Sequence, residues 1–186
     1  MTGLRAVLAC VALGTGSLSC AGGHASARGD DSTLVGVTSA DQVPLALVLD
    51  GLDGTPVDIA QYRGRAVLVI AFLMDDLPSH SHMRHVEHVA REFGDDLVVL
   101  AVAGDRQPYR LHRDMAAIFA RVNELQRTHI LLADDAVRDG ASGLGSIDAV
   151  PTTFLVNRAG VIARRVAGYM DYPQLRALVE PAVPRR

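Results

Sequence analysis

The chain has 186 residues, which is enough for one domain with additional segments. Hydrophobic residues make up 49% of it and charged residues 21%, an ordinary balance for a globular protein. The formal net charge is −3, so the composition gives no indication of binding to nucleic acid or to an anionic membrane surface.

The first twenty residues have the pattern of an export signal. Arg5 precedes a short apolar run that ends near Gly14, and small residues follow it up to Cys20. Such a run is too short to span a bilayer. Cys20 resembles the modified cysteine of a bacterial lipobox, although Ser17 stands where a leucine is expected. We predict an export or lipoprotein signal over 1–19 with lipidation of Cys20; a secretory signal cut nearby is the alternative.

Two further segments follow the signal. Residues 20–42 are rich in Gly, Ala, Ser and Asp without a sustained apolar period, which predicts a flexible tether. Residues 43–186 form the predicted domain. The only cysteines, Cys10 and Cys20, precede this domain. Its core therefore has to be stable without a disulfide, as a chain of this length allows.

The first half of the domain predicts a hairpin followed by a strand–helix–strand unit. Residues 45–49 and 57–59 flank a turn rich in Asp and Gly, which indicates a β-hairpin. The continuous apolar runs at 66–73 and 97–103 are typical of strands buried on both faces. Between them, apolar residues at helical spacing predict a helix over 79–93, ended by a glycine.

The second half adds two helices and another hairpin. We predict a helix over 109–125 and a short strand at 130–132. The expected apolar stripe of that helix consists of Met115, Ile118, Phe119 and Val122. Strands at 152–156 and 161–166 would form the second hairpin, and a helix over 172–179 closes the chain. This order predicts an α/β fold, a three-layer sandwich with a mixed central sheet flanked by helices.

Three segments resemble the TlpA/ResA-type thioredoxin-like family, a redoxin group related to the AhpC/TSA peroxiredoxins. They are 53–57 with 64–69, then 94–100, and 149–156 followed by Gly160. The resemblance covers roughly 45–184 and implies a thioredoxin-like sandwich with an N-terminal hairpin. It also implies that Pro151, after Val150, is cis and that its loop faces the active-site turn.

The chain departs from this family at the catalytic motif. Where relatives have Trp-Cys-x-x-Cys after the first central strand, this sequence reads Asp76-Leu77-Pro78-Ser79-His80. Leu77 and His80 occupy the two cysteine positions. Without a thiolate there is no nucleophile for disulfide exchange, and a peroxiredoxin cysteine is missing as well. We therefore predict no catalytic residue of the family type in this domain.

The leading functional hypothesis is an exported, lipid-anchored thioredoxin-fold protein that serves as a non-catalytic binding or assembly module at the bacterial cell envelope or in the periplasm. The expected partner is a protein or an extended peptide. Its predicted binding loop comprises 76–80 together with Val150 and Pro151. The membrane contact would be the lipid at Cys20, and no nucleic acid is expected.

Two alternatives remain open. The first is a carrier or buffer for Zn²⁺ or Cu²⁺, because imidazoles and a carboxylate at helical spacing can share a metal ion. The candidate ligands are His85, His88 and Glu92, with His80 and His82 as further candidates. The second is residual redox activity that uses a thiol supplied by a partner protein.

Overall fold

The computed structural model describes residues 33–35, 43–104 and 113–184. The predicted signal over 1–19 and Cys20 lie outside the described residues. The described residues include eight strands, which form one sheet in the order β1-β8-β7-β4-β5-β6-β2-β3. The strands are β1 (Thr33–Val35), β2 (Val48–Gly51), β3 (Pro56–Asp58), β4 (Ala66–Leu73), β5 (Leu97–Gly104), β6 (Thr128–Leu132), β7 (Thr152–Val156) and β8 (Ile162–Ala167).

In the described part of the chain, four α-helices and two short 3₁₀-helices accompany the sheet. They are α1 (Leu77–Phe93), α2 (Arg113–Val122), α3 (Asp135–Arg138), α4 (Tyr172–Val179), η1 (Ile59–Tyr62) and η2 (Gly94–Asp96). Both predicted hairpins are present, as β2–β3 and β7–β8. The short helix α3 lies between β6 and β7, where the sequence predicted no regular element.

The centre of the sheet is formed by β4 and β5, which pair in parallel over eight residues each. All but the last residue of each strand is buried, as their uninterrupted apolar sequences predict. Antiparallel β7 flanks β4, and parallel β6 flanks β5, so the sheet is mixed. The predicted three-layer α/β sandwich is confirmed.

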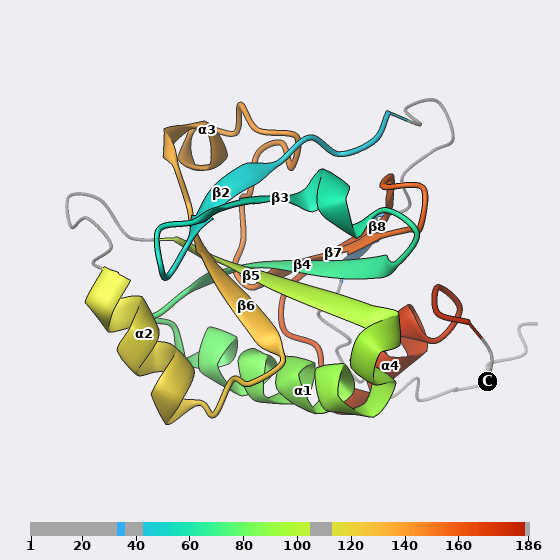
Figure 1. The fold of residues 1–186 in the computed structure, drawn as a ribbon. Coiled ribbons are helices and arrows are strands. Elements are labelled where there is room, and N and C mark those ends of the chain that lie inside the picture. Colours follow the sequence, from blue (N-terminus) through green and yellow to red (C-terminus); the bar gives the residue numbers. More distant parts are fainter. Residues whose placement is uncertain (1–32, 36–42, 105–112, 185–186) are drawn as a thin grey trace, which may run out of the picture.

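Each face of the sheet has its own apolar core. Figure 1 shows α1 and α4 together on one face and α3 on the other. Alternate residues of β4 divide between the two: Leu68 and Ile70 pack with α1, whereas Val67 and Val69 pack with the segment around Leu47. The period of two along a strand explains this division.

Two further details differ from the prediction. Thr33–Val35, within the predicted tether 20–42, form β1 and pair antiparallel with β8; three residues are too few to show a strand pattern in the sequence. In α2, Ala116 and Phe119 are buried but Met115 and Ile118 are largely exposed. The spacing of apolar residues predicted a helix here correctly. The face of α2 that is buried against the protein, however, is rotated by about a quarter-turn from the predicted apolar stripe.

Helix α1 begins at Leu77, two residues before the predicted start. Asp76 is its N-cap, with extended backbone angles, and Pro78 lies in its first turn, where the missing amide proton costs nothing. Gly94, with a φ of 54°, follows its last residue.

Within the described ranges, no helix is both long and apolar enough to cross a membrane.

Candidate functional site

The predicted binding loop lies at one end of the paired strands β4 and β7. Ala71 of β4 is opposite Thr152 of β7 in an antiparallel ladder. The chain that leaves β4 therefore runs beside the residues that precede β7, namely Val150 and Pro151. The Val150–Pro151 peptide bond is cis, as the resemblance implied.

The turn after β4 is fixed by Asp76. Its Oδ2 atom accepts hydrogen bonds from the backbone amide of Ser79, at 2.9 Å, and from the Ser79 hydroxyl, at 2.7 Å. Ser79 is fully buried, so this hydroxyl is not available to a substrate. Because the cap holds the first turn of α1 in place, the position of Leu77 is well defined. Its side chain is 80% exposed.

His80 points inward, behind this turn. Its Nε2 atom lies 2.7 Å from the carbonyl oxygen of Met74, which can only accept, so Nε2 carries a proton and donates. The ring packs against Phe119 of α2, with 4.8 Å between ring centroids. Of the two positions at which the resemblance implies cysteines, position 77 thus faces solvent and position 80 faces the protein.

The loop that carries the cis proline is held by hydrogen bonds from residues that follow it in the chain. The hydroxyl of Thr152 donates to the carbonyl of Ala149 at 2.6 Å, and the amide of Gly168 donates to the carbonyl of Pro151 at 2.8 Å. Among the described residues, no hydrogen bond involves the backbone amide or carbonyl of Val150. An extended peptide laid along this residue can therefore pair with its backbone, as a strand adds to a sheet edge.

His82, one of the further candidate metal ligands, lies in the core. It is fully buried. Its Nε2 atom is 2.9 Å from the Thr153 hydroxyl, and the Met170 amide nitrogen is 3.1 Å from Nδ1. Burial is the main reason why the pKa of His82 is lowered to about 4; the Met170 carbonyl opposes this shift and the nearby His85 adds to it. A neutral His82 therefore connects α1 to β7 and to the segment after β8.

The other proposed metal ligands are engaged separately. His85 Nε2 is 2.9 Å from the Tyr169 hydroxyl, and the His88 ring stacks on Tyr172 with 4.3 Å between centroids. Glu92 accepts from the Tyr172 hydroxyl at 2.7 Å and from Arg176 at 2.9 Å, and these two bonds hold its pKa below the usual range. Within the part of the chain that the structure describes, no three His, Cys, Asp or Glu residues are placed to share a metal ion.

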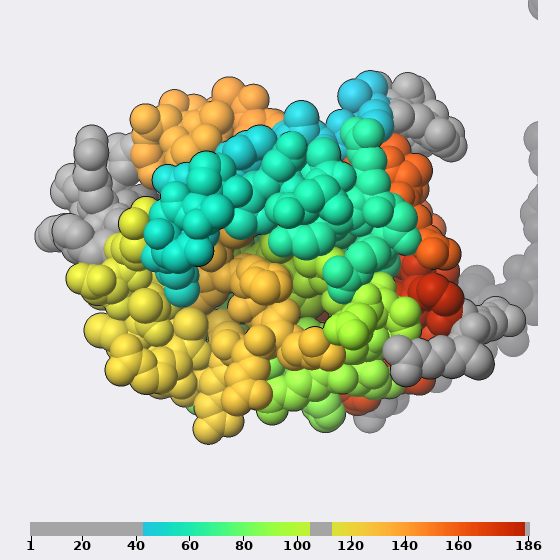
Figure 2. Space-filling model, in the orientation of Figure 1, coloured from blue at the N-terminus to red at the C-terminus, as the bar shows by residue number. Residues whose placement is uncertain are grey.

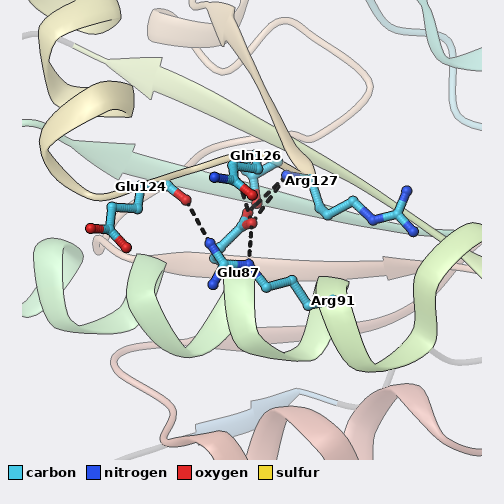
Figure 3. A network of polar contacts seen from close by, with 6 residues as sticks. Glu87, Arg91, Glu124, Gln126 and Arg127 are labelled. Carbon is cyan, nitrogen blue, oxygen red and sulfur yellow. Dashed lines mark hydrogen bonds and ion pairs between the residues drawn. The ribbon is translucent and has the colours of Figure 1, made fainter.

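A buried carboxylate, Glu87, links α1 to the turn between α2 and β6. This residue was not among those identified from the sequence. Glu87 is 3% exposed and accepts from the amides of Gln126 and Arg127, from the Thr128 hydroxyl and from Arg91 (Figure 3). Arg91 also donates to the carbonyl of Glu124. These bonds fasten α1 to the turn between α2 and β6. A glutamate among polar residues of an amphipathic helix carries no signal that distinguishes such a role.

Similarity to known proteins is confined to three-dimensional structure. No protein-family model and no curated protein matches the sequence. A secreted thiol-disulfide isomerase from Corynebacterium glutamicum superimposes with a TM-score of 0.67 at 18% identity, covering 86% of this chain and 93% of the other. A thioredoxin-family thiol:disulfide interchange protein from Chlorobium tepidum TLS gives 0.65 at 18% identity, covering 79% and 100%.

A DsbF homologue from Corynebacterium diphtheriae is also similar, with a TM-score of 0.65, 17% identity, and coverage of 84% of this chain and 96% of that one. At such identities the likeness concerns the arrangement of the backbone, to which the mixed sheet described above belongs. This chain has a thioredoxin-like fold.

Proposed function

We propose that this protein is a redoxin-family relative of the TlpA/ResA type that has lost thiol chemistry and binds an extended segment of a partner protein. The binding site is the surface between Leu77 and Val150–Pro151, which we call the cis-proline groove. In this role the protein acts as a non-catalytic binding or assembly module.

One observation carries this proposal: an exposed leucine stands where an accessible nucleophile would be required, at the end of the sheet where the unpaired backbone of Val150 also lies. Leu77 is 80% exposed at the first position of α1. A large apolar side chain in that position favours contact with a partner, because its burial on binding is worth about 1.5–3 kcal/mol. It offers nothing to electron transfer.

The sequence supports the loss of redox chemistry independently. No cysteine follows Cys20 in this sequence, so the domain has no thiol of its own. The similar structures from Corynebacterium glutamicum and Chlorobium tepidum are described as a thiol-disulfide isomerase and a thiol:disulfide interchange protein, which suggests descent from such enzymes. Activity through a partner's thiol would need the same groove, and no structural observation favours it over binding.

We further propose that the protein is exported and anchored through Cys20. The motif around Cys20 supports this, and similar structures include a secreted isomerase and a pneumococcal exposed lipoprotein thioredoxin. Mass spectrometry of the membrane-extracted protein from its own host should show the added lipid at an N-terminal Cys20. An unmodified Cys20, or a mature chain that begins after it, would rule out the anchor.

Binding is tested by panning a library of unstructured ten-residue peptides against the purified protein and measuring the selected peptides by fluorescence anisotropy. We expect Leu77→Asp to weaken binding by about tenfold or more, since it places a charge in an apolar contact. Val48→Asp is the matched control, because Val48 is also an exposed apolar residue but belongs to β2, outside the groove. Failure to select any peptide, or equal affinities for both variants, would refute the proposal.

A further inference from the structure

A cavity opens beside the cis-proline groove, at the ends of the central strands. It has a volume of about 350 Å³. Its walls include Leu73, Val102, Val137, Ile147, Ala149 and Val150. We call it the strand-end pocket. It lies at the carboxyl ends of β4 and β5, which is where ligands commonly bind in parallel α/β sheets.

The pocket and the groove share a residue. Val150 lines the pocket, and the same Val150 has the unpaired backbone groups to which an extended peptide can bind. Side chains alternate between the two sides of an extended strand, so a peptide paired with Val150 directs every second side chain toward one side. One of them would therefore be presented to the mouth of the strand-end pocket.

The lining specifies the chemistry of the side chain that enters. Apart from Arg138 and Asp148, all lining residues are apolar. Arg138 already donates to the Ala133 carbonyl and pairs with Asp135, and Asp148 accepts from the Ser146 hydroxyl. The charge of Arg138 is therefore compensated. The hydroxyl bond leaves the exposed Asp148 carboxylate without a counter-charge, which disfavours an acidic side chain. A strongly polar side chain that enters the apolar part of the pocket loses its hydration.

We propose that the strand-end pocket is a specificity pocket that receives one bulky apolar side chain, such as that of leucine or phenylalanine, from the peptide bound in the cis-proline groove. This inference rests on the proposed peptide binding and adds the class of segment that is bound. The partner is a chain with a large apolar residue in an extended region, and alanine or aspartate at that position is rejected.

The test uses the peptides selected by panning, resynthesised with Phe, Leu, Ala or Asp at each position in turn. At one position, replacement of Phe or Leu by Ala should weaken binding by about 10- to 100-fold, as for other hydrophobic pockets. Ala149→Phe should fill the mouth of the pocket and abolish this preference while still allowing the Ala peptide to bind. Ala149 is exposed, so the fold should tolerate this change.

Ala159→Phe is the control, since Ala159 is an exposed alanine in the turn between β7 and β8. Peptides that bind without a preference at any position would refute the specificity pocket but leave the proposed function standing. Failure of all peptides to bind would refute both. A last measurement uses 1-anilinonaphthalene-8-sulfonate, a dye that binds apolar surfaces. If Ala149→Phe removes dye binding but bound peptide does not displace the dye, the pocket is a site for a free small molecule. That result would also overturn this assignment.

Discussion

The histidine in the core makes folding sensitive to acid. The folded protein holds His82 neutral down to about pH 4, because burial lowers its pKa, whereas an unfolded chain protonates the same group near 6.5. Between these values the unfolded state binds more protons, so stability decreases as the pH falls through this window. One such group changes the free energy of unfolding by about 1.4 kcal/mol per pH unit, about 3 kcal/mol in all.

We therefore predict that His82→Gln, which cannot titrate, has a shallower loss of stability between pH 6.5 and pH 4 than the unmodified protein. Urea unfolding followed by circular dichroism at several pH values gives the two slopes. His129→Gln, at an exposed histidine, is the control for a His-to-Gln change outside the core. Parallel curves for the His82 variant and the unmodified protein would show that this histidine is not the group that titrates.

The sequence provided the least information about which residues the α1 histidines contact. Spacing on a helix identifies His82, His85 and His88 as near neighbours, but it gives no information about what each one meets in space. The structure places His82 against Thr153, distant by 71 positions in the chain, and the other two against Tyr169 and Tyr172. Those tyrosines had no pattern that linked them to α1.

At the level of elements, α1 is the helix on which the site depends. Its first turn carries Leu77 and His80, and its middle is fixed by the buried Glu87 (Figure 3). We predict that Glu87→Gln lowers the free energy of unfolding by about 2–3 kcal/mol, because an amide NH₂ would then face donors that need an acceptor. Chemical denaturation of the two proteins measures this difference.

Glu124→Gln is the matched control in the same network. The oxygen that Arg91 contacts belongs to the backbone of Glu124, and its side chain is exposed, so this change should cost less than about 0.5 kcal/mol. A small loss in the Glu87 variant would mean that water replaces the missing acceptor and that the network does not hold the helix.

Elements whose apolar residues repeat clearly along the sequence were predictable. Features that depend on packing against neighbouring elements were not. The buried strands β4 and β5 and the helices α1 and α4 follow from the sequence, because their apolar residues repeat over many positions. For α2, the sequence predicted the helix but not which of its faces packs against the protein. Figure 2 shows α2 at the surface of the molecule, so only part of its circumference is covered, and the sequence does not indicate which part.

At the level of the whole molecule, the fold is thioredoxin-like, and Leu77 and His80 stand where the family resemblance implies two cysteines. The N-cap on α1, the cis proline and the inward-facing residue at position 80 are all present. If only the thiols are missing, restoring them should restore chemistry. A thiol at the start of a helix is also more acidic than a free one, because the positive end of the helix stabilises the thiolate.

We predict that, with dithiothreitol as the reductant that regenerates the two thiols, the double variant Leu77→Cys/His80→Cys accelerates insulin reduction by about an order of magnitude or more over the unmodified protein. Position 77 supplies an accessible thiolate and position 80 a resolving thiol. The single variant Leu77→Cys is the control and should not turn over efficiently without the second thiol. Insulin reduction by the unmodified protein would instead show that it uses chemistry other than its own cysteines. A folded but inactive double variant would show that the groove itself has been reshaped for binding, so that the thiols alone do not make it an enzyme.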